Sequence, residues 1–268
     1  MIQLEEPAPA KVNLALHVRG KMPDGRHRME TVFAFCTEGD KLAASTADEL
    51  TIDTAGPFAA ELSAIEDNLV MRAAQALRDR SGVEQGAALI LTKNLPLASG
   101  IGGGSADAAA ALRLLTRLWR IDPTHASAVA PALGADVPAC LLSMSARGDG
   151  VGDQLQLVDL GVSGAPVLLV NPRVPVSTGE IFARWDGHDR GPLGNWREGR
   201  NDLQAPAIDV APQIAMVLAW LSAQPGAELV RMSGSGATCF ALFADEEARD
   251  VAAEGVPREW WRLPTTLR

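Results

Sequence analysis

A glycine-rich stretch near the middle of the chain could bind an anion through its backbone. Residues 95–105 read LPLASGIGGGS, with glycine at four of the five positions 100–104. Backbone N–H groups at the start of a helix attract phosphate, and glycine places no Cβ in the way of the ligand. The chemistry that this favours is binding of an anion, whose identity stays open at this point, and the alternative is a tight turn without a ligand.

The usual phosphate-binding motifs do not fit this stretch. A P-loop requires a lysine after its last glycine, whereas Ser105 and Ala106 follow Gly104. A dinucleotide-binding fingerprint starting at Gly100 requires glycine where Ser105 stands. The stretch therefore predicts a third kind of phosphate cradle.

Lys11 and Asp136 could carry charge or proton chemistry. In the segment 12–18, apolar residues alternate with polar ones, so Lys11 and Asn13 project from the same face of a strand. The alternative for Lys11 is a strand-edge lysine whose ammonium group reaches water. Asp136 stands among small and apolar residues, where a buried carboxylate must be paired or functional. Its alternative is an aspartate in a surface turn.

The elements that must position these residues alternate between strands and helices. An apolar run at 88–91 predicts the strand before the glycines, and helical spacing predicts the helix 106–121 after them. Ser105 is predicted to cap this helix, and Asp107 to lie favourably near its positive end. Residues 66–69 open a second helix, which runs to about 81–82, and there the carboxamide of Asn68 caps the helix or contacts a ligand.

Further elements follow the same reasoning. The predicted strands are 31–36, 49–53, 166–172, 228–232, 238–243 and 260–263; the helices are 125–133, one starting at 177, 212–221 and 245–254; and turns or loops are 23–27, 56–57, 148–152 and 186–200. This order predicts an α+β protein with a sandwich of ferredoxin type, divided into residues 1–160 and 161–268.

Composition limits the class of protein. The 268 residues are 47% hydrophobic, and the net charge of −9 argues against nucleic acid and anionic membranes as partners. Residues 1–6 lack the features of a signal peptide, and no apolar run is long enough to span a membrane. Cys36, Cys140 and Cys239 are far apart and predict reduced, packed thiols of a cytoplasmic protein. The four histidines lack metal-ligand spacing, so no metal site is predicted.

Three separated stretches together resemble the signature motifs of the GHMP small-molecule kinases. They are PAKVNL at 9–14, residues 96–109, and MSGSGAT at 232–238. Within this family, the stretches 24–27, 66–69, 134–138 and 201–207 resemble those of enzymes acting on 4-diphosphocytidyl-2-C-methyl-D-erythritol. The resemblance implies two domains, an N-terminal one like ribosomal protein S5 domain 2 and a ferredoxin-like C-terminal one, with the active site between them.

The resemblance also implies a reaction and a set of site residues. ATP would phosphorylate a hydroxyl of the cytidyl substrate, a step of the non-mevalonate isoprenoid precursor pathway, and Mg²⁺ would accompany ATP. Lys11 and Asp136 match the catalytic pair, in which Asp136 accepts the alcohol proton and Lys11 offsets charge on the phosphoryl group. Matches to ATP-binding positions are Asn68, Lys93, Pro96, Gly100, Gly102, Gly103, Gly104 and Ser105, and matches to substrate-binding positions are Asn13, Arg26, His27 and Phe182.

Two positions depart from the family pattern. Arg26 stands where the family usually has tyrosine, and the chain contains no tyrosine that could cover the cytosine. Its guanidinium group either replaces that ring or lies in solvent in a turn. Ala106 and Asp107 replace a serine and an asparagine, which puts the role of the second hydroxyl in doubt.

Other interpretations remain open at the level of sequence. The chain could be a GHMP kinase for homoserine or a mevalonate-type substrate, or a nucleotide-binding regulator without catalysis. The presence of both Lys11 and Asp136 argues against a regulator, because binding alone requires no base. A monomer or a homodimer is expected.

Overall fold

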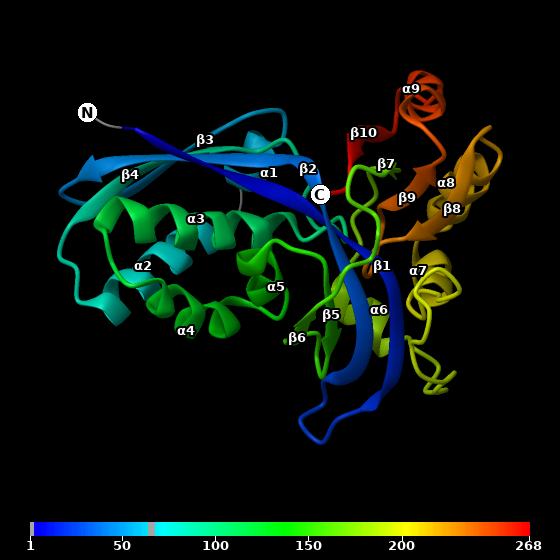
Figure 1. Ribbon diagram of the computed structural model, residues 1–268, viewed down its shortest axis with the longest axis horizontal. Coiled ribbons are helices and arrows are strands. Elements are labelled where there is room, and N and C mark those ends of the chain that lie inside the picture. The colour runs from blue at the N-terminus through cyan, green and yellow to red at the C-terminus, as the bar shows by residue number, and fades with distance from the viewer. Residues whose placement is uncertain (1–2, 64–67) are drawn as a thin grey trace. The chain divides into compact units, whose positions relative to one another are not determined.

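The computed structural model describes residues 3–63 and 68–268, so Glu66 and Asp67 of the 66–69 motif lie outside the described residues (Figure 1). The chain forms two compact units whose sequences are interleaved. The first unit comprises residues 1–10, 38–97 and 102–143, and the second comprises 11–37, 98–101 and 144–268. Two long strands, β1 (Leu4–Lys21) and β2 (His27–Ala47), contribute to both units. The division at 160/161 stays a prediction.

The first unit combines strands with a group of mutually packed helices. In it, β4 (Gly86–Thr92) pairs antiparallel with the second half of β2 and parallel with β3 (Leu50–Ala55). The helices α2 (Leu69–Ser81), α3 (Gly103–Trp119) and α4 (Pro123–Leu133) pack against one another, as Figure 1 shows. The alanines of α3 are buried, which lets the neighbouring helices approach closely. The unit also contains the short helices α1 (Ala59–Ser63) and α5 (Val137–Leu142).

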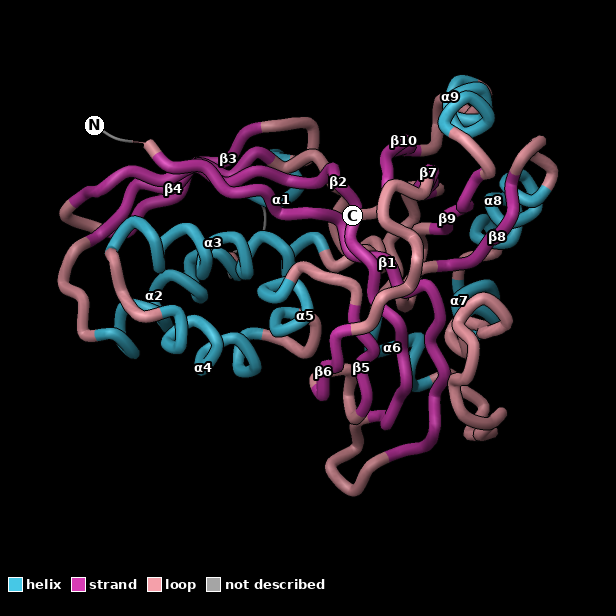
Figure 2. The backbone as a smooth tube through the Cα atoms, viewed as in Figure 1, coloured by secondary structure: helices cyan, strands magenta, loops and turns pink. Residues whose placement is uncertain are grey.

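The second unit contains a ferredoxin-like sheet. Its strands β7 (Pro166–Asn171), β8 (Ala227–Met232), β9 (Cys239–Phe243) and β10 (Trp261–Thr266) are antiparallel in the order β10-β7-β9-β8 (Figure 2). Helices α8 (Gln213–Ser222) and α9 (Glu246–Glu254) bury apolar residues in one core cluster with this sheet. The predicted α+β class and the ferredoxin-like part are therefore confirmed.

The rest of the second unit consists of short elements. The strand β5 (Ala146–Asp149) pairs with the first half of β2 and with β6 (Gln154–Leu157). The helices α6 (Thr178–Ala183) and α7 (Gln204–Val210) complete it. The predicted turn at 148–152 was partly wrong, because its first two residues end β5.

Three short helices were missed by the sequence analysis. These are α1, α5 and α7, of five to seven residues each. Two of them contain a proline in their first turn, Pro138 in α5 and Pro206 in α7. Proline is tolerated there, because the N–H that it lacks would have no partner in the helix.

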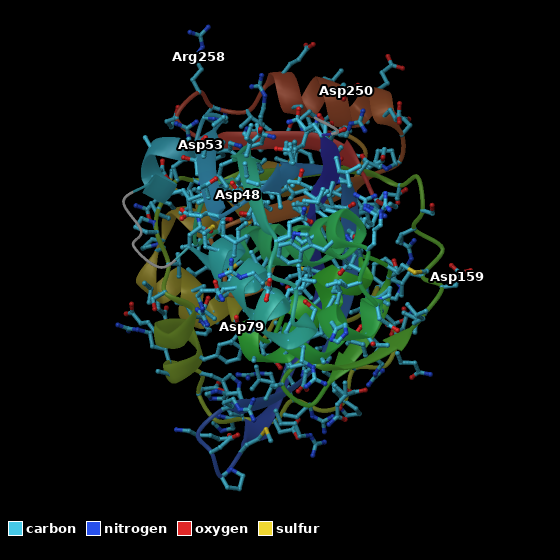
Figure 3. All side chains as sticks on the ribbon, turned by 90° about the vertical axis from the view of Figure 1, so that its left-hand side faces the viewer. Asp48, Asp53, Asp79, Asp159, Asp250 and Arg258 are labelled. Atoms are coloured by element: carbon cyan, nitrogen blue, oxygen red, sulfur yellow. The ribbon has the colours of Figure 1, made fainter. Side chains whose placement is uncertain are left out.

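Several acidic side chains lie at the surface of the protein. The labelled side chains of Asp48, Asp53, Asp79, Asp159 and Asp250 are all exposed (Figure 3). In contrast, all three cysteines are buried, as the sequence predicted. Within the described ranges, no helix is both long and apolar enough for a bilayer crossing.

Candidate active site

Lys11 is held inside the protein by neighbours on two strands. Residues 8–18 of β1 are buried on both faces, and Lys11 is only 3% exposed. The alternative of a strand-edge lysine reaching water was therefore wrong. Lys11 Nζ donates to Asn13 Oδ1 at 2.7 Å and lies 5.4 Å from the centre of the Phe33 ring. Asn13 in turn donates to Thr31 Oγ1 at 2.8 Å, so the ammonium group has a fixed position.

The first part of the glycine stretch, residues 98–101, packs against the loop that follows β8. Gly100 has a φ of +74°, and a Cβ there would lie 2.5 Å from the carbonyl oxygen of Ser233. Ser233 Oγ donates to the Gly100 carbonyl oxygen at 2.9 Å, and Thr238 N donates to that of Ser99 at 3.1 Å. Gly100 is thus required by a close backbone neighbour. The third signature motif, residues 232–238, therefore holds residues 99 and 100 of the glycine stretch in place by hydrogen bonds.

The second part of the stretch starts α3. Gly102, with a φ of +66°, is the N-cap residue, and no side chain caps the helix. The predicted cap at Ser105 was wrong, since this residue already lies within α3, and Asp107 is buried rather than placed at the helix end. The first N–H groups of a helix have no partner within it, so they can bind an anion.

Gly103 and Gly104 have different neighbours. A Cβ on Gly103 would lie 3.1 Å from Lys93 Nζ and 3.7 Å from Leu95 Cβ, inside the protein. Gly104 is exposed, and no atom lies within 4 Å of the position of its Cβ. Protein neighbours therefore account for glycine at positions 100 and 103, and the predicted phosphate contacts of these two residues stay a prediction. Of these residues, Gly104 presents its backbone to open space.

Lys93 forms a buried cluster with two carboxylates. Its Nζ lies 2.5 Å from Asp40 Oδ2 and 2.7 Å from Asp107 Oδ2, and the lysine side chain is 2% exposed. Burial acts to lower the pKa of Lys93, but the two carboxylates outweigh burial and raise it. Burial raises the pKa of Asp107 to about 7; Lys93 opposes this rise and Asp40 adds to it.

Asp40 also connects this cluster to the chain leading into the glycine stretch. Its Oδ1 accepts from the backbone N–H groups of Asn94 at 2.5 Å and Leu95 at 2.8 Å. Pro96, the next residue, is buried. The predicted contact of Lys93 with a nucleotide base stays a prediction, since its ammonium group points to the two carboxylates.

Asn68 and Asp136 both stand at helix starts. Asn68 Oδ1 accepts from the backbone N–H of Val70 at 2.9 Å, so the capping interpretation is confirmed, whereas its ligand contact stays a prediction. Asp136 is the N-cap residue of α5 and is half-buried. Its carboxylate makes no capping hydrogen bond to that helix, which distinguishes it from Asn68.

Aromatic rings gather around His27. Its ring centre lies 5.1 Å from that of Phe182 and 5.7 Å from that of Trp185, whose plane is nearly perpendicular. Burial, and secondarily the charge of Lys21, lower the pKa of His27, which favours a neutral ring. The sequence analysis did not single out Trp185. Trp185 lies two residues beyond the last residue of α6, so its spacing from Phe182 gave no helix-face signal.

Arg26 lies in the turn before these rings and is paired locally. Its Nε donates to Asp24 Oδ2 at 2.8 Å, and its side chain is 62% exposed. This geometry matches the solvated-turn interpretation of Arg26; its contact with substrate stays a prediction.

A cavity of about 320 Å³ lies in the second unit beside Trp185. Arginines and aspartates in its wall are paired with each other, Arg190 with Asp186 and Arg200 with Asp202. Among residues 3–63 and 68–268, no group of three or more histidines, cysteines or acidic side chains could hold a metal ion.

Comparison with known proteins matches two family models to the chain. The model of the GHMP kinases N terminal domain matches residues 68–144, and that of the GHMP kinases C terminal matches residues 184–262.

Relatives in sequence match over almost the whole chain. A 4-diphosphocytidyl-2-C-methyl-D-erythritol kinase of Rhizorhabdus wittichii is 51% identical, covering 98% of this chain and 94% of that protein. A protein of the same name from Novosphingobium aromaticivorans is 46% identical, covering 100% of this chain and 94% of that one.

Solved structures agree in fold. A 4-(cytidine 5'-diphospho)-2C-methyl-D-erythritol kinase has a TM-score of 0.84 and 31% identity, with coverage of 98% of this chain and 99% of that one. A homoserine kinase from Cytophaga hutchinsonii has a TM-score of 0.72 at 18% identity, and the match covers 99% of this chain and 95% of that one.

Proposed function

The chain belongs to the GHMP kinase family, and from this premise we propose that it phosphorylates a hydroxyl of 4-diphosphocytidyl-2-C-methyl-D-erythritol with ATP. The observation that carries the proposal is the 51% identity, over 98% of the chain, to a kinase named for this substrate. The similarity to homoserine kinase, at 18% identity, reflects the fold alone. The reaction has its place in the non-mevalonate isoprenoid precursor pathway and is expected in the cytoplasm, in a monomer or a homodimer.

ATP is proposed to bind with its phosphates at the start of α3. The uncapped N–H groups there and the exposed backbone of Gly104 support this placement. Ser105, within the first turn, could add a hydroxyl donor, and Asn68 is assigned to the side of the nucleotide base. The buried ammonium group of Lys93 lies next to Gly103, at the start of α3. Mg²⁺ is proposed to arrive with ATP, where it would neutralise charge on the phosphates.

Lys11 and Asp136 are proposed to act on the transferred group and on the acceptor alcohol. The ammonium group of Lys11 is fixed by Asn13, so it could stabilise negative charge without reorganising. The carboxylate of Asp136 is half-buried, so it is partly accessible to an acceptor alcohol whose proton it could accept.

The cytosine is proposed to bind at the rings of His27 and Phe182. A neutral imidazole can both donate and accept a hydrogen bond, as recognition of a base edge requires. Flat rings also provide a stacking surface for the base. Trp185, which packs edge-on against His27, would supply aromatic area that the family obtains from tyrosine.

The test is a panel of acceptor alcohols with ATP and Mg²⁺. The purified protein is mixed with 4-diphosphocytidyl-2-C-methyl-D-erythritol, homoserine or mevalonate, and the phosphorylated product is detected by ³¹P NMR. We expect turnover of the cytidyl substrate alone. Better turnover of homoserine or mevalonate would assign the chain to another branch of the family.

A further inference from the structure

The cluster of Lys93, Asp40 and Asp107 carries charge directly below the proposed phosphate site. Its three side chains are almost completely buried, so little water screens them. With both carboxylates ionised the cluster has a net charge of −1, and with one proton added it is neutral. The number of protons in the cluster therefore sets the charge that an incoming phosphate meets.

We propose that Asp107 is a positioning residue that takes up a proton when ATP binds, so that the cluster becomes neutral below the phosphates. This inference rests on the proposed binding of ATP at the start of α3. It assigns a role to Asp107, which the sequence comparison left only as a departure from the family pattern.

The position of the cluster supports this coupling. Lys93 Nζ would lie 3.1 Å from a Cβ on Gly103, the first residue of α3. Asp107 follows Gly103 by four residues, which is about 6 Å along a helix axis. A negative charge at this distance opposes the partial positive charge of the helix start and repels phosphate.

Asp107, rather than Asp40, is the carboxylate that takes the proton. Asp40 accepts hydrogen bonds from two backbone N–H groups and from the Lys93 ammonium group, and these bonds stabilise the ionised form of Asp40. The Oδ1 atom of Asp107 is buried without a hydrogen-bond partner. An ionised Asp107 leaves that oxygen unsatisfied, whereas a protonated one can donate to Asp40.

The groups that face Asp107 are Lys93, after β4, and Asp40, on β2. The pKa of Asp107 is raised to about 7, first by burial and then by Asp40, against the opposing charge of Lys93. A raised pKa brings protonation of Asp107 closer to neutral pH, and added phosphate charge favours the protonated form further.

The experiment measures proton uptake during ATP binding by calorimetry. The binding of MgATP is measured near pH 7.5 in several buffers that differ in ionisation enthalpy, because the dependence on buffer gives the number of protons taken up. Three proteins are compared: the wild type, Asp107→Asn, and the control Asp79→Asn, whose carboxylate is exposed on α2. Asparagine keeps the shape of Asp107 and cannot ionise.

We expect the wild type and Asp79→Asn to take up roughly half a proton per ATP more than Asp107→Asn does. From about pH 6 to about pH 8.5, the affinity of the wild type for ATP should fall roughly 4- to 20-fold further than that of Asp107→Asn. Equal proton uptake by all three proteins would overturn the role of Asp107. Failure of all three folded proteins to bind ATP would instead overturn the proposed function.

If Asp107→Asn does not fold, the carboxyl group itself provides the test. The titration of Asp107 in ¹³C-labelled wild type is followed by NMR with and without MgATP, and a rise of its pKa on binding is expected. An unchanged titration would overturn the proposal.

Discussion

Ser233 Oγ donates a hydrogen bond to the Gly100 carbonyl oxygen at 2.9 Å, although 133 positions separate the two residues. Ser233 Oγ also accepts a hydrogen bond from the backbone N–H of Asn13 at 3.1 Å. The Ser233 hydroxyl group thus connects β1, the strand that carries Lys11, to Gly100 of the glycine stretch.

We predict that Ser233→Ala destabilises the fold by about 1–3 kcal/mol, because it leaves a buried donor and a buried acceptor without partners. The KM for ATP should rise as residues 98–101 lose their support. Thermal unfolding and steady-state kinetics measure the two effects. Ser235→Ala is the control, since Ser235 lies in the same loop and bonds to Thr178 instead. Equal effects of the two substitutions would contradict the prediction.

Gly104→Val should mainly weaken ATP binding, whereas Gly103→Val should mainly lower the stability of the fold. A side chain on Gly104 enters open space, so the protein should fold normally. The valine side chain should keep the phosphates of ATP away from the backbone, so ATP should bind at least about tenfold more weakly. A side chain on Gly103 meets the Lys93 ammonium group, so that variant should lose stability first. Calorimetry with ATP and thermal unfolding distinguish the two. A Gly104→Val protein with unchanged ATP affinity would remove the phosphate site from this position.

Asp136→Asn should lower kcat by about 10²–10⁴, since a proton acceptor is lost while the shape of the side chain is kept. The affinity for ATP should barely change, because the carboxylate is assigned to the acceptor alcohol. Single-turnover kinetics with calorimetry for ATP provide the measurement. A variant that retains more than about half of the wild-type kcat would exclude Asp136 as the base.

Trp185→Ala should raise the KM for the cytidyl substrate roughly 5- to 150-fold, the loss expected for one stacked base. Arg26→Ala should change this KM less than about twofold, because the guanidinium group is exposed and paired with Asp24. Neither change should alter the KM for ATP. The reverse order of effects would show that Arg26 covers the base, and rescue by Arg26→Tyr but not by Arg26→Lys would then establish stacking.

The stability of the protein should depend on pH through Asp107. Its pKa is raised from 3.8 to about 7 on folding, so the folded protein retains a proton that the unfolded chain releases. Stability from this group is therefore present at low pH and is lost as pH rises toward 7. Asp107→Asn should match the wild type near pH 4 and exceed it above pH 7, by at most about 4 kcal/mol. Urea unfolding at several pH values measures the difference, and identical pH profiles would contradict it.

The sequence predicted those elements whose apolar residues are contiguous or periodic. The strands β7 and β9, and the helix α9, were placed within two residues of their observed ends. For β1, alternation predicted one polar face, yet Lys11 and Asn13 on that face are buried. Their burial depends on Thr31 and Ser233, partners from other parts of the chain, which no local pattern indicates.

The candidate site could be predicted in its residues but only partly in its contacts. The pairing of Lys93 with Asp40 depends on the register between β2 and β4, in which Lys41 lies opposite Thr92. Local sequence does not determine such a register. For the same reason, the sequence could not show that protein atoms, rather than a phosphate, lie next to Gly100 and Gly103.

The burial of Cys36, Cys140 and Cys239 makes their sulfur atoms reporters of unfolding. Burial raises the pKa of the Cys239 thiol, so its reactive thiolate form is suppressed in the folded protein. Alkylation by a thiol reagent then requires opening of the surrounding structure, and its rate follows the opening equilibrium. A cysteine introduced at an exposed position could therefore be labelled selectively with a fluorophore, without first removing the native thiols.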